Sequence, residues 1–279
     1  MSKMVPVPSN SIVPERDVDK PPILETHHLG IDFGGLTAVD DFTLTVGRTE
    51  IAGLIGPNGA GKTTVFNLLT NVYAPTRGDI MLDGHSTARK NTAQVSRMGI
   101  ARTFQNIRLF SDMSVIDNVK VGLHNSIRQT FFSSVTHLFG YRKSERKSNE
   151  QALEFLDFFN MADLAQHKAG SLPYGEQRRL EIARALATHP SIILLDEPAA
   201  GMNPTETAEL LDIINVIRDK FHISVLLIEH DMSLVMKICE RIQVIDYGVT
   251  IASGKPEEIA NNPRVIEAYL GKDEEEVAL

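Results

Sequence analysis

The sequence has a single cysteine and no tryptophan, and it lacks any long run of apolar residues. One cysteine, Cys239, cannot form an internal disulfide or a zinc site built from several thiolates, and it fits a reducing compartment. The longest apolar runs, such as 192–195 and 225–228, fall far below the ~18 residues of a membrane span. Residues 1–20 carry charges and prolines without an apolar centre, so they do not form a secretory signal. We therefore expect a chain that is neither secreted nor membrane-spanning on its own.

The balance of residue types fits a soluble globular protein. Apolar residues make up 42% and charged residues 23% of the 279 positions, which excludes a disordered chain. The 28 basic and 36 acidic residues give a net charge of −8, which argues against nucleic acid as the main partner. At about 150 residues per domain, the length corresponds to roughly two structural units.

Apolar patterning predicts a sheet whose strands alternate with helices. Three short segments are almost wholly apolar: 51–55, 192–195 and 225–228. Such strands, separated by a helical pattern like that of 210–221, are typical of a parallel sheet covered on both faces. Residues 111–170 lack strands of this kind, and their apolar spacing predicts a helical insertion. The mixed-charge run at 142–147 favours a solvated helix face over a binding surface.

Residues 56–63 match the phosphate-binding pattern G-x-x-x-x-G-K-[ST] at every fixed position. They follow the apolar segment 51–55 and open a predicted helix, which is the context that the motif requires. The glycines let successive backbone N–H groups point at phosphate oxygens, and the helix N-terminus adds its positive end. We expect Lys62 to reach the β- and γ-phosphates and the Thr63 hydroxyl to bind Mg²⁺. The expected nucleotide contacts are Gly56, Pro57, Asn58, Gly59, Ala60, Gly61, Lys62, Thr63 and Thr64.

Residues 192–197, Ile-Ile-Leu-Leu-Asp-Glu, predict a buried strand that ends in two carboxylates. Asp196 can hold the water shell of Mg²⁺, and Glu197 can orient or deprotonate an attacking water as a general base. A polar strand end without a catalytic role is the simpler alternative, but the phosphate-binding loop favours hydrolysis. The sequence has no Asn-Lys-x-Asp segment for guanine, which argues against a GTPase.

Shortly before that strand lies a segment that resembles the signature of ABC ATPases, usually Leu-Ser-Gly-Gly-Gln. Its residues are Leu172, Pro173, Tyr174, Gly175, Glu176 and Gln177. Four further elements of that family occur in order: Phe33 for the adenine-stacking aromatic, Gln105 for the Q-loop, Asn203 for the D-loop and His230 for the switch histidine. The resemblance covers about residues 23–271, and it adds Val39 to the expected ATP contacts.

The resemblance implies an α/β fold, the ABC cassette. Its parts are a P-loop, RecA-like, mostly parallel sheet core, an N-terminal antiparallel β part and an α-helical insertion. The implied boundaries are a flexible leader at 1–22, an ATP-binding core at 23–110 and 185–271, a helical signature subdomain at 111–184, and an acidic tail at 272–279.

The family mechanism implies that two cassettes pair head to tail around two ATP molecules. The signature of each cassette would then face the phosphates bound by the other, offering backbone N–H groups at a helix N-terminus. The implied catalytic residues are Glu197, Gln105 and His230, with His230 at the γ-phosphate. The implied Mg²⁺ contacts are Thr63, Gln105 and Asp196.

Two residues depart from the family pattern. Pro173 stands where the signature usually has serine, and proline offers neither a hydroxyl nor an N–H group. Asn203 replaces the usual D-loop aspartate, so the resemblance leaves signalling across the pair at this loop open. Because Lys62, Asp196 and Glu197 are intact, we expect this chain's own site to hydrolyse ATP.

Within the family, the sequence resembles the cassettes of bacterial importers for branched-chain or other hydrophobic amino acids. The segments that carry this resemblance are 101–106, 180–184, 198–204 and 261–271. It implies a second, non-identical cassette, two membrane permease subunits, a periplasmic binding protein that acts indirectly, and no nucleic acid. It also implies a peripheral position on the cytoplasmic face of the inner membrane.

Three alternatives stay open at this point. A lipopolysaccharide exporter cassette is disfavoured by Pro173-Tyr174 and Met202-Asn203, because exporters usually keep Ser-Gly-Gly in the signature. A non-transport nucleotide-sensing module is favoured only by Pro173 and Asn203, and the intact Glu197 argues against it. A nucleic-acid-dependent ATPase is the third, and stimulation of turnover by DNA or RNA would identify it.

Overall fold

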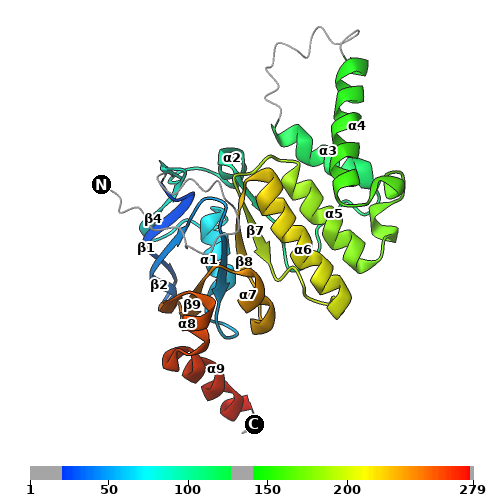
Figure 1. The fold of residues 1–279 in the computed structure, drawn as a ribbon. Helices are drawn as coiled ribbons and strands as arrows, with labels where there is room; N and C mark the ends of the chain where they lie inside the picture. The colour runs from blue at the N-terminus through cyan, green and yellow to red at the C-terminus, as the bar shows by residue number, and fades with distance from the viewer. Residues whose placement is uncertain (1–20, 127–140, 277–279) are drawn as a thin grey trace.

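The computed structural model describes residues 21–126 and 141–276, and it confirms the α/β class. Most of the predicted leader, residues 1–20, lies outside the described part of the chain. Within the described residues the strands form two sheets, with orders β2-β1-β4-β5 and β10-β9-β3-β8-β7-β6 (Figure 1). None of the helices in these residues is long and apolar enough to cross a membrane.

The six-stranded sheet is the mostly parallel core. Its strands are β3 (Ile51–Ile55), β6 (Ile100–Arg102), β7 (Ile192–Asp196), β8 (Ser224–Ile228), β9 (Arg241–Asp246) and β10 (Val249–Gly254). Strand β3 pairs in parallel with β8 and β9, β7 pairs in parallel with β8 and β6, and β10 closes the edge antiparallel to β9. The carboxyl ends of β3 and β7 therefore point to the same edge of the sheet, where the two predicted motifs follow.

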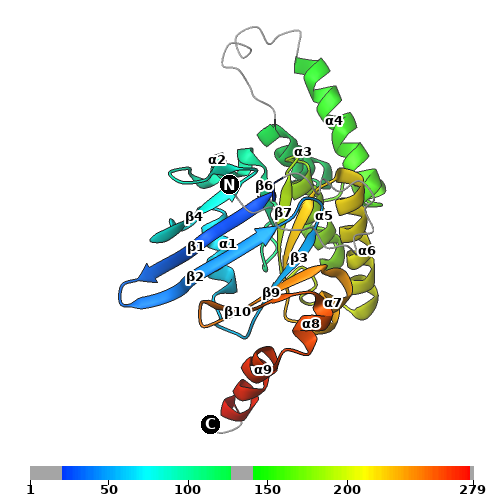
Figure 2. The same cartoon turned by 60° about the vertical axis from the view of Figure 1, so that its left-hand side comes forward.

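The second sheet is antiparallel. Two of its strands precede β3 in the chain, and the other two follow α1. It contains β1 (Leu24–Phe33), β2 (Leu36–Val46), β4 (Arg77–Leu82) and β5 (His85–Ser86). In strand β2 the residues from Phe42 to Val46 alternate between buried and more exposed positions, whereas most of the first half of the strand is exposed. Helix α1 (Lys62–Leu69) lies between the two sheets (Figure 2).

Alternate residues of the core strands enter two separate apolar cores. In β3, Ala52 and Leu54 pack with α1 and the antiparallel sheet, whereas Ile51 and Ile55 pack with the helices on the other face. Both faces of the strand are thus removed from water, which explains why the sequence of 51–55 is continuously apolar.

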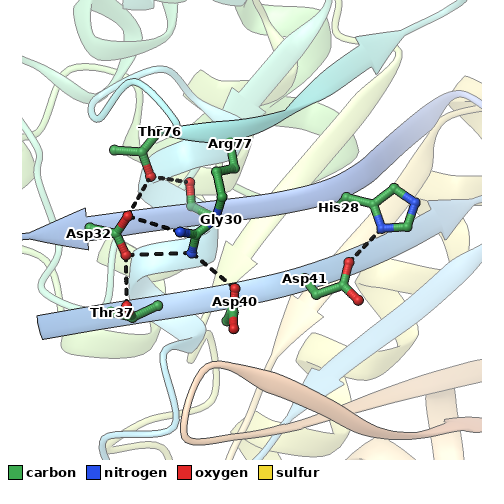
Figure 3. A network of polar contacts seen from close by, with 8 residues as sticks. All are labelled: His28, Gly30, Asp32, Thr37, Asp40, Asp41, Thr76 and Arg77. Carbon is green, nitrogen blue, oxygen red and sulfur yellow. Dashed lines mark hydrogen bonds and ion pairs between the residues drawn. The ribbon is translucent and has the colours of Figure 1, made fainter.

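Polar side chains connect the antiparallel strands on their exposed face. Arg77 of β4 donates to Asp32 of β1 at 3.1 Å and to Asp40 of β2 at 2.9 Å (Figure 3). Thr37 also donates to Asp32, and this hydrogen bond is the largest of the causes that lower the pKa of that carboxyl. The network fixes the β1–β2 hairpin, which precedes the P-loop in the chain, relative to β4, which follows α1.

Helix α2 (Thr92–Met98) packs into the same apolar core as α1. The remaining helices cover the other face and one end of the core sheet: α3 (Val115–Ser126), α4 (Tyr141–Phe158), α5 (Tyr174–Leu186), α6 (Pro204–Phe221), α7 (Met232–Ile238), α8 (Pro256–Ala260) and α9 (Pro263–Glu276). Helix α3 packs against α4 and α5 at the end away from the antiparallel sheet (Figure 1). Helix α9 extends through Glu276, past the start of the tail expected at residue 272. In α4, Arg146 is exposed and pairs with Glu150 one turn later, as on a solvated helix face.

Candidate functional site

The P-loop connects the end of β3 to the start of α1. Gly61 is the N-cap of α1 with φ +105°, a left-handed conformation that glycine adopts without strain. The Lys62 ammonium donates to the backbone oxygens of Gly56 at 2.5 Å and Pro57 at 2.9 Å. The lysine side chain therefore folds back over the P-loop, where the phosphates of a nucleotide are expected to bind.

The turn between β9 and β10 holds the P-loop in place through a backbone hydrogen bond. The Gly248 N–H donates to the Ala60 oxygen at 2.9 Å, and the Gly248 oxygen accepts from the Asp40 N–H at 2.9 Å. One turn thus joins the P-loop to β2, where Val39 is fully buried and lies beside Gly61. Sequence reasoning missed Gly248, for which a turn-forming Tyr-Gly pair was the only local indication.

Phe33, the expected adenine-stacking residue, lies at the end of β1. Its side chain is exposed, and its ring makes an edge contact with the Tyr73 ring at a centroid distance of 5.2 Å. Tyr73 follows α1 at the end of the helix away from the P-loop. An exposed ring held by one edge contact can still turn toward a bound base, so the role of Phe33 stays a prediction.

The two carboxylates that end β7 differ in their surroundings. Asp196 is buried and forms an ion pair with Arg102 at 2.8 Å. Glu197 has φ +46°, a conformation that costs about 1–3 kcal/mol for a residue other than glycine and is concentrated at functional sites. Because of this backbone conformation, the adjacent side chains of Asp196 and Glu197 have different partners, Arg102 for the first and Gln105 and His230 for the second.

Gln105 and His230 both bind the Glu197 carboxylate. The Gln105 Nε2 donates to Oε2 at 2.6 Å, and the His230 Nε2 lies 2.5 Å from Oε1. The structure thus brings together the three residues that the sequence proposed as catalytic, from three separate segments of the chain. Both oxygens of the carboxylate are engaged in this arrangement.

Arg102 is a residue that sequence reasoning missed. Besides Asp196, its guanidinium donates to the Asn67 side chain of α1 at 2.8 Å. It also lies over the rings of Phe66 and Phe104, at 5.4 and 5.0 Å from their centroids. It therefore holds the end of β7 against the helix that follows the P-loop.

The donor types near the P-loop fit a magnesium ion that binds together with nucleotide. Mg²⁺ prefers oxygen ligands and is commonly held by one or two carboxylates plus substrate phosphates. Among the described residues, no group of three His, Cys, Asp or Glu side chains is arranged to hold a metal on its own. The Thr63 hydroxyl and the Asp196 carboxylate supply the expected kind of partial ligand set.

A further buried carboxylate, Glu229, supports the segments on both sides of Glu197. It accepts hydrogen bonds from the backbone N–H groups of Ala199 at 2.9 Å and His230 at 3.3 Å. Burial raises the pKa of Glu229 above its usual value. Two residues further along, Asp231 caps α7 and accepts from the Ser233 hydroxyl, the main cause that lowers the pKa of Asp231.

The predicted signature lies at the start of α5. Tyr174 is the first helical residue and is exposed, and Pro173 precedes it as an N-cap without a side-chain hydrogen bond. Gly175 is buried, because Glu206 of α6 lies over it; a Cβ at Gly175 would be 3.1 Å from Glu206 Oε1. The Gln177 side chain donates to the Leu172 oxygen at 2.8 Å. Sequence reasoning did not anticipate Glu206.

Asn203 has a clear local role at the start of α6. Its side-chain oxygen accepts from the N–H groups of Thr205 and Glu206, both at 3.0 Å, and the Glu206 carboxylate accepts from the Asn203 N–H, also at 3.0 Å. This is a capping box, with Pro204 at the first helical position. Asparagine and aspartate are about equally good N-caps, so the departure from aspartate leaves this helix end intact.

This cap predicts unequal effects for two substitutions. Asn203→Ala should lower the free energy of unfolding by about 1 kcal/mol, whereas Asn203→Asp should leave it nearly unchanged. Urea unfolding of the two variants beside the wild type measures the difference. Equal stability of all three proteins would contradict the assigned cap.

These positions define an ATP-binding cassette, and the comparisons with known proteins agree. The family model described as ABC transporter matches residues 39–200, and the model described as branched-chain amino acid ATP-binding cassette transporter matches residues 249–275. The chain belongs to the ABC transporter family, as one of its ATP-binding cassettes and ATPases. Within that family, it falls among proteins described as ATP-binding proteins of branched-chain amino acid transport.

The individual relatives are similar over nearly their whole length. BraF of Pseudomonas aeruginosa is 47% identical over 251 residues, which cover 90% of this chain and 98% of the relative. LivG of Escherichia coli is 46% identical with the same coverage. LptB of Haemophilus influenzae, a lipopolysaccharide export ATP-binding protein, is 33% identical over 250 residues, 90% of this chain and 98% of the relative.

A solved structure agrees with the fold. The ADP conformation of MJ1267, an ATP-binding cassette of an ABC transporter, superposes with a TM-score of 0.78 at 30% identity. It covers 90% of this chain and 99% of that chain. The fold and the family resemblance inferred from the sequence are thereby confirmed.

Proposed function

We propose that this chain hydrolyses ATP to drive a branched-chain amino acid importer, as one of two cassettes attached to membrane permease subunits. The observation that carries the proposal is the carboxylate of Glu197, held at the end of β7 by Gln105 and His230. Similarity to BraF and LivG supports the amino acid cargo.

The geometry supports a general-base role for Glu197. Its side chain is only 13% exposed, so few competing waters reach it. Gln105 and His230 occupy its two oxygens at rest. For hydrolysis, at least one of these side chains must turn toward the nucleotide, which frees a carboxylate oxygen to take a proton from the attacking water. Magnesium bound by Thr63 and Asp196 would supply charge neutralisation at the phosphates.

The resemblance to ABC ATPases implies that the site is incomplete in one chain, because part of the donors placed where charge develops in the transition state would come from a second cassette. We propose that a second, non-identical cassette supplies them from its signature, while Tyr174 and Gly175 of this chain serve the partner's ATP. An N-terminus of a helix is well suited to bind phosphate, since its first N–H groups have no intrahelical acceptor.

An apolar groove beside the Q-loop suits a permease segment. It encloses about 640 Å³ between α3, α5 and the edge of the core. Phe110 and Val121 expose apolar surface in it, and Arg184 lies over the Phe110 ring at 5.6 Å. Burial lowers the pKa of Arg184. Phe104 lines the same groove next to Gln105, so a permease segment seated there would contact the residue before the catalytic glutamine.

Three further parts of the proposal follow from this assembly. The periplasmic binding protein acts on the permease and does not contact this chain. The cassette is peripheral, on the cytoplasmic face of the inner membrane. No nucleic acid takes part, in keeping with the acidic net charge of −8.

Reconstitution tests the proposal and its alternatives together. In liposomes with the partner cassette and permease subunits, we expect ATP-dependent uptake of leucine, isoleucine or valine and hydrolysis stimulated by the loaded binding protein. Absence of ATPase activity, alone and in the complex, would contradict the proposal and favour a nucleotide-sensing module. ATP-driven extraction of lipopolysaccharide would favour the exporter, and stimulation by DNA or RNA would favour a nucleic-acid ATPase.

A further inference from the structure

Arg178 on α5 has an unusual position for a charged side chain. It is fully buried, and its guanidinium donates to two consecutive backbone oxygens of the Q-loop, those of Phe104 and Gln105, each at 2.7 Å. It also forms an ion pair with Glu181, one turn later on the same helix, at 2.7 Å. A helix side chain thus binds the backbone immediately around the catalytic glutamine.

Glu181 extends this contact along the Q-loop. Its second oxygen accepts from the Arg108 N–H at 3.1 Å, and its side chain is 1% exposed. The Arg108 guanidinium in turn lies 4.1 Å from the centroid of the Phe104 ring. Segment 104–108 is therefore hydrogen-bonded to α5 at both ends, by Arg178 at its start and by Glu181 at its end.

The Arg178 guanidinium also contacts the signature, because its Nη2 lies 3.3 Å from the Tyr174 hydroxyl. The Tyr174 ring in turn lies beside Gly201 of the D-loop, where an added Cβ would be 3.5 Å from the ring. On the other side, the Gln105 side chain binds Glu197. A continuous chain of contacts therefore runs from the catalytic carboxylate through the Q-loop to the first residue of α5.

Stability alone does not account for a buried ion pair of this kind. Taking both charges out of water costs several kcal/mol, and apolar residues of similar volume commonly stabilise a fold as well or better. What an apolar pair cannot do is bind three backbone groups of a loop in one geometry. The arrangement therefore favours a role in positioning.

We propose that Arg178, supported by Glu181, is a positioning residue that makes the Q-loop and the start of α5 move as one unit. The proposal rests on the proposed function, in which each composite site combines the P-loop of one cassette with the signature of the other. When Gln105 leaves Glu197 to engage nucleotide in this chain's own site, Arg178 transmits the shift to Tyr174 and Gly175. The signature that this chain offers to its partner is thereby set by the state of its own site.

A double-mutant cycle tests the route through Gln105. In the full transporter, Arg178→Lys should lower kcat about tenfold, equivalent to about 1.4 kcal/mol, with KM for ATP changed less than about twofold. In a Gln105→Ala background the same substitution should have almost no further effect, because the residues act as one unit. A structural defect would instead cost the same factor in both backgrounds.

A matched control separates this effect from loss of a buried cation. Arg218 on α6 is equally buried and paired with Glu240 at 3.1 Å. Arg218→Lys should leave the ratio of rates with and without Gln105 unchanged. Tyr174→Phe removes only the hydroxyl contact and should give a smaller, Gln105-dependent loss, which keeps the test usable if Arg178→Lys folds poorly.

Hydrogen exchange tests the same link without measuring hydrolysis. In the isolated wild-type chain, ATP should change amide exchange in both segments 104–108 and 174–178, and in Arg178→Lys only in the first. If ATP leaves the exchange of 174–178 unchanged in the wild type, the link between the Q-loop and α5 is overturned. Equal kcat losses in both Gln105 backgrounds would also overturn this link. If ATP changes the exchange of 174–178 but the chain has no ATPase activity, only the proposed function is overturned.

Discussion

Glu197→Gln should abolish most ATP hydrolysis while leaving ATP binding intact. Glutamine keeps the size and the hydrogen-bonding oxygen of the side chain, but it cannot accept a proton from water. General-base catalysis contributes typically 10²–10⁴-fold, so we expect kcat to fall by about that factor. Lys62 and the P-loop are untouched, and the affinity for ATP should change little.

Steady-state hydrolysis and equilibrium binding of a fluorescent ATP analogue measure the two effects separately. Glu150→Gln is a suitable control, because Glu150 is an exposed carboxylate of α4 that pairs with Arg146, outside the segments that form the site. It removes the same charge and should leave kcat nearly unchanged. A Glu197→Gln protein that hydrolyses ATP at more than about a tenth of the wild-type rate would exclude Glu197 as the base.

Gly56→Ala should destabilise the chain and remove ATP binding together. A Cβ at this position would lie 2.0 Å from the backbone oxygen of Ile245 in β9, and a backbone oxygen cannot move aside cheaply. Overpacking of this kind costs about 1–3 kcal/mol or more, which lowers Tm by several degrees in a chain of this size. The P-loop must shift away from β9, and a displacement of about 1 Å suffices to reduce function 10²-fold.

Thermal unfolding and ATP titration of the variant test this prediction. Gly35→Ala is the matched control, since nothing lies within 4 Å of the added Cβ and its backbone is not in the left-handed region. That control should keep both Tm and affinity. A Gly56→Ala protein with wild-type Tm would show that the P-loop is not held against β9 as the structure indicates.

Local sequence patterns predicted the central elements of this fold. Segments 51–55 and 192–195 are continuously apolar because both faces of their strands enter a core. The phosphate-binding motif fixes its own strand–loop–helix context, which is why its position was predictable from eight residues. The antiparallel strands were harder to delimit, because half-exposed strands carry only a weak alternation.

The contacts that organise the site were not predictable from local pattern. Arg102 pairs with Asp196 across 94 positions, and Arg178 binds the Gln105 oxygen across 73. Gly248 reaches the P-loop from the opposite end of the chain. Such pairs are created by the order of strands in the sheet, and a single sequence gives no spacing rule for them.

Two departures from the family pattern now have different explanations. Asn203 keeps the capping function at the start of α6, so its difference from aspartate is accommodated locally. Pro173 leaves α5 without a side-chain cap, while Tyr174 beside it contacts Arg178. The structure thus explains the position of the tyrosine, and it shows no compensating contact for the missing serine hydroxyl among the described residues.

The composite site is the central claim, and the mass of the Glu197→Gln chain in solution tests it most directly. Mixed with its partner cassette and measured by sedimentation, this chain should form a two-cassette particle only when ATP is present. Adding Tyr174→Asp should leave ATP bound and the fold intact, since an acidic residue suits the first turn of a helix, yet prevent that pairing through repulsion of the partner's phosphates. A mass that stays at one cassette with ATP bound would contradict the account.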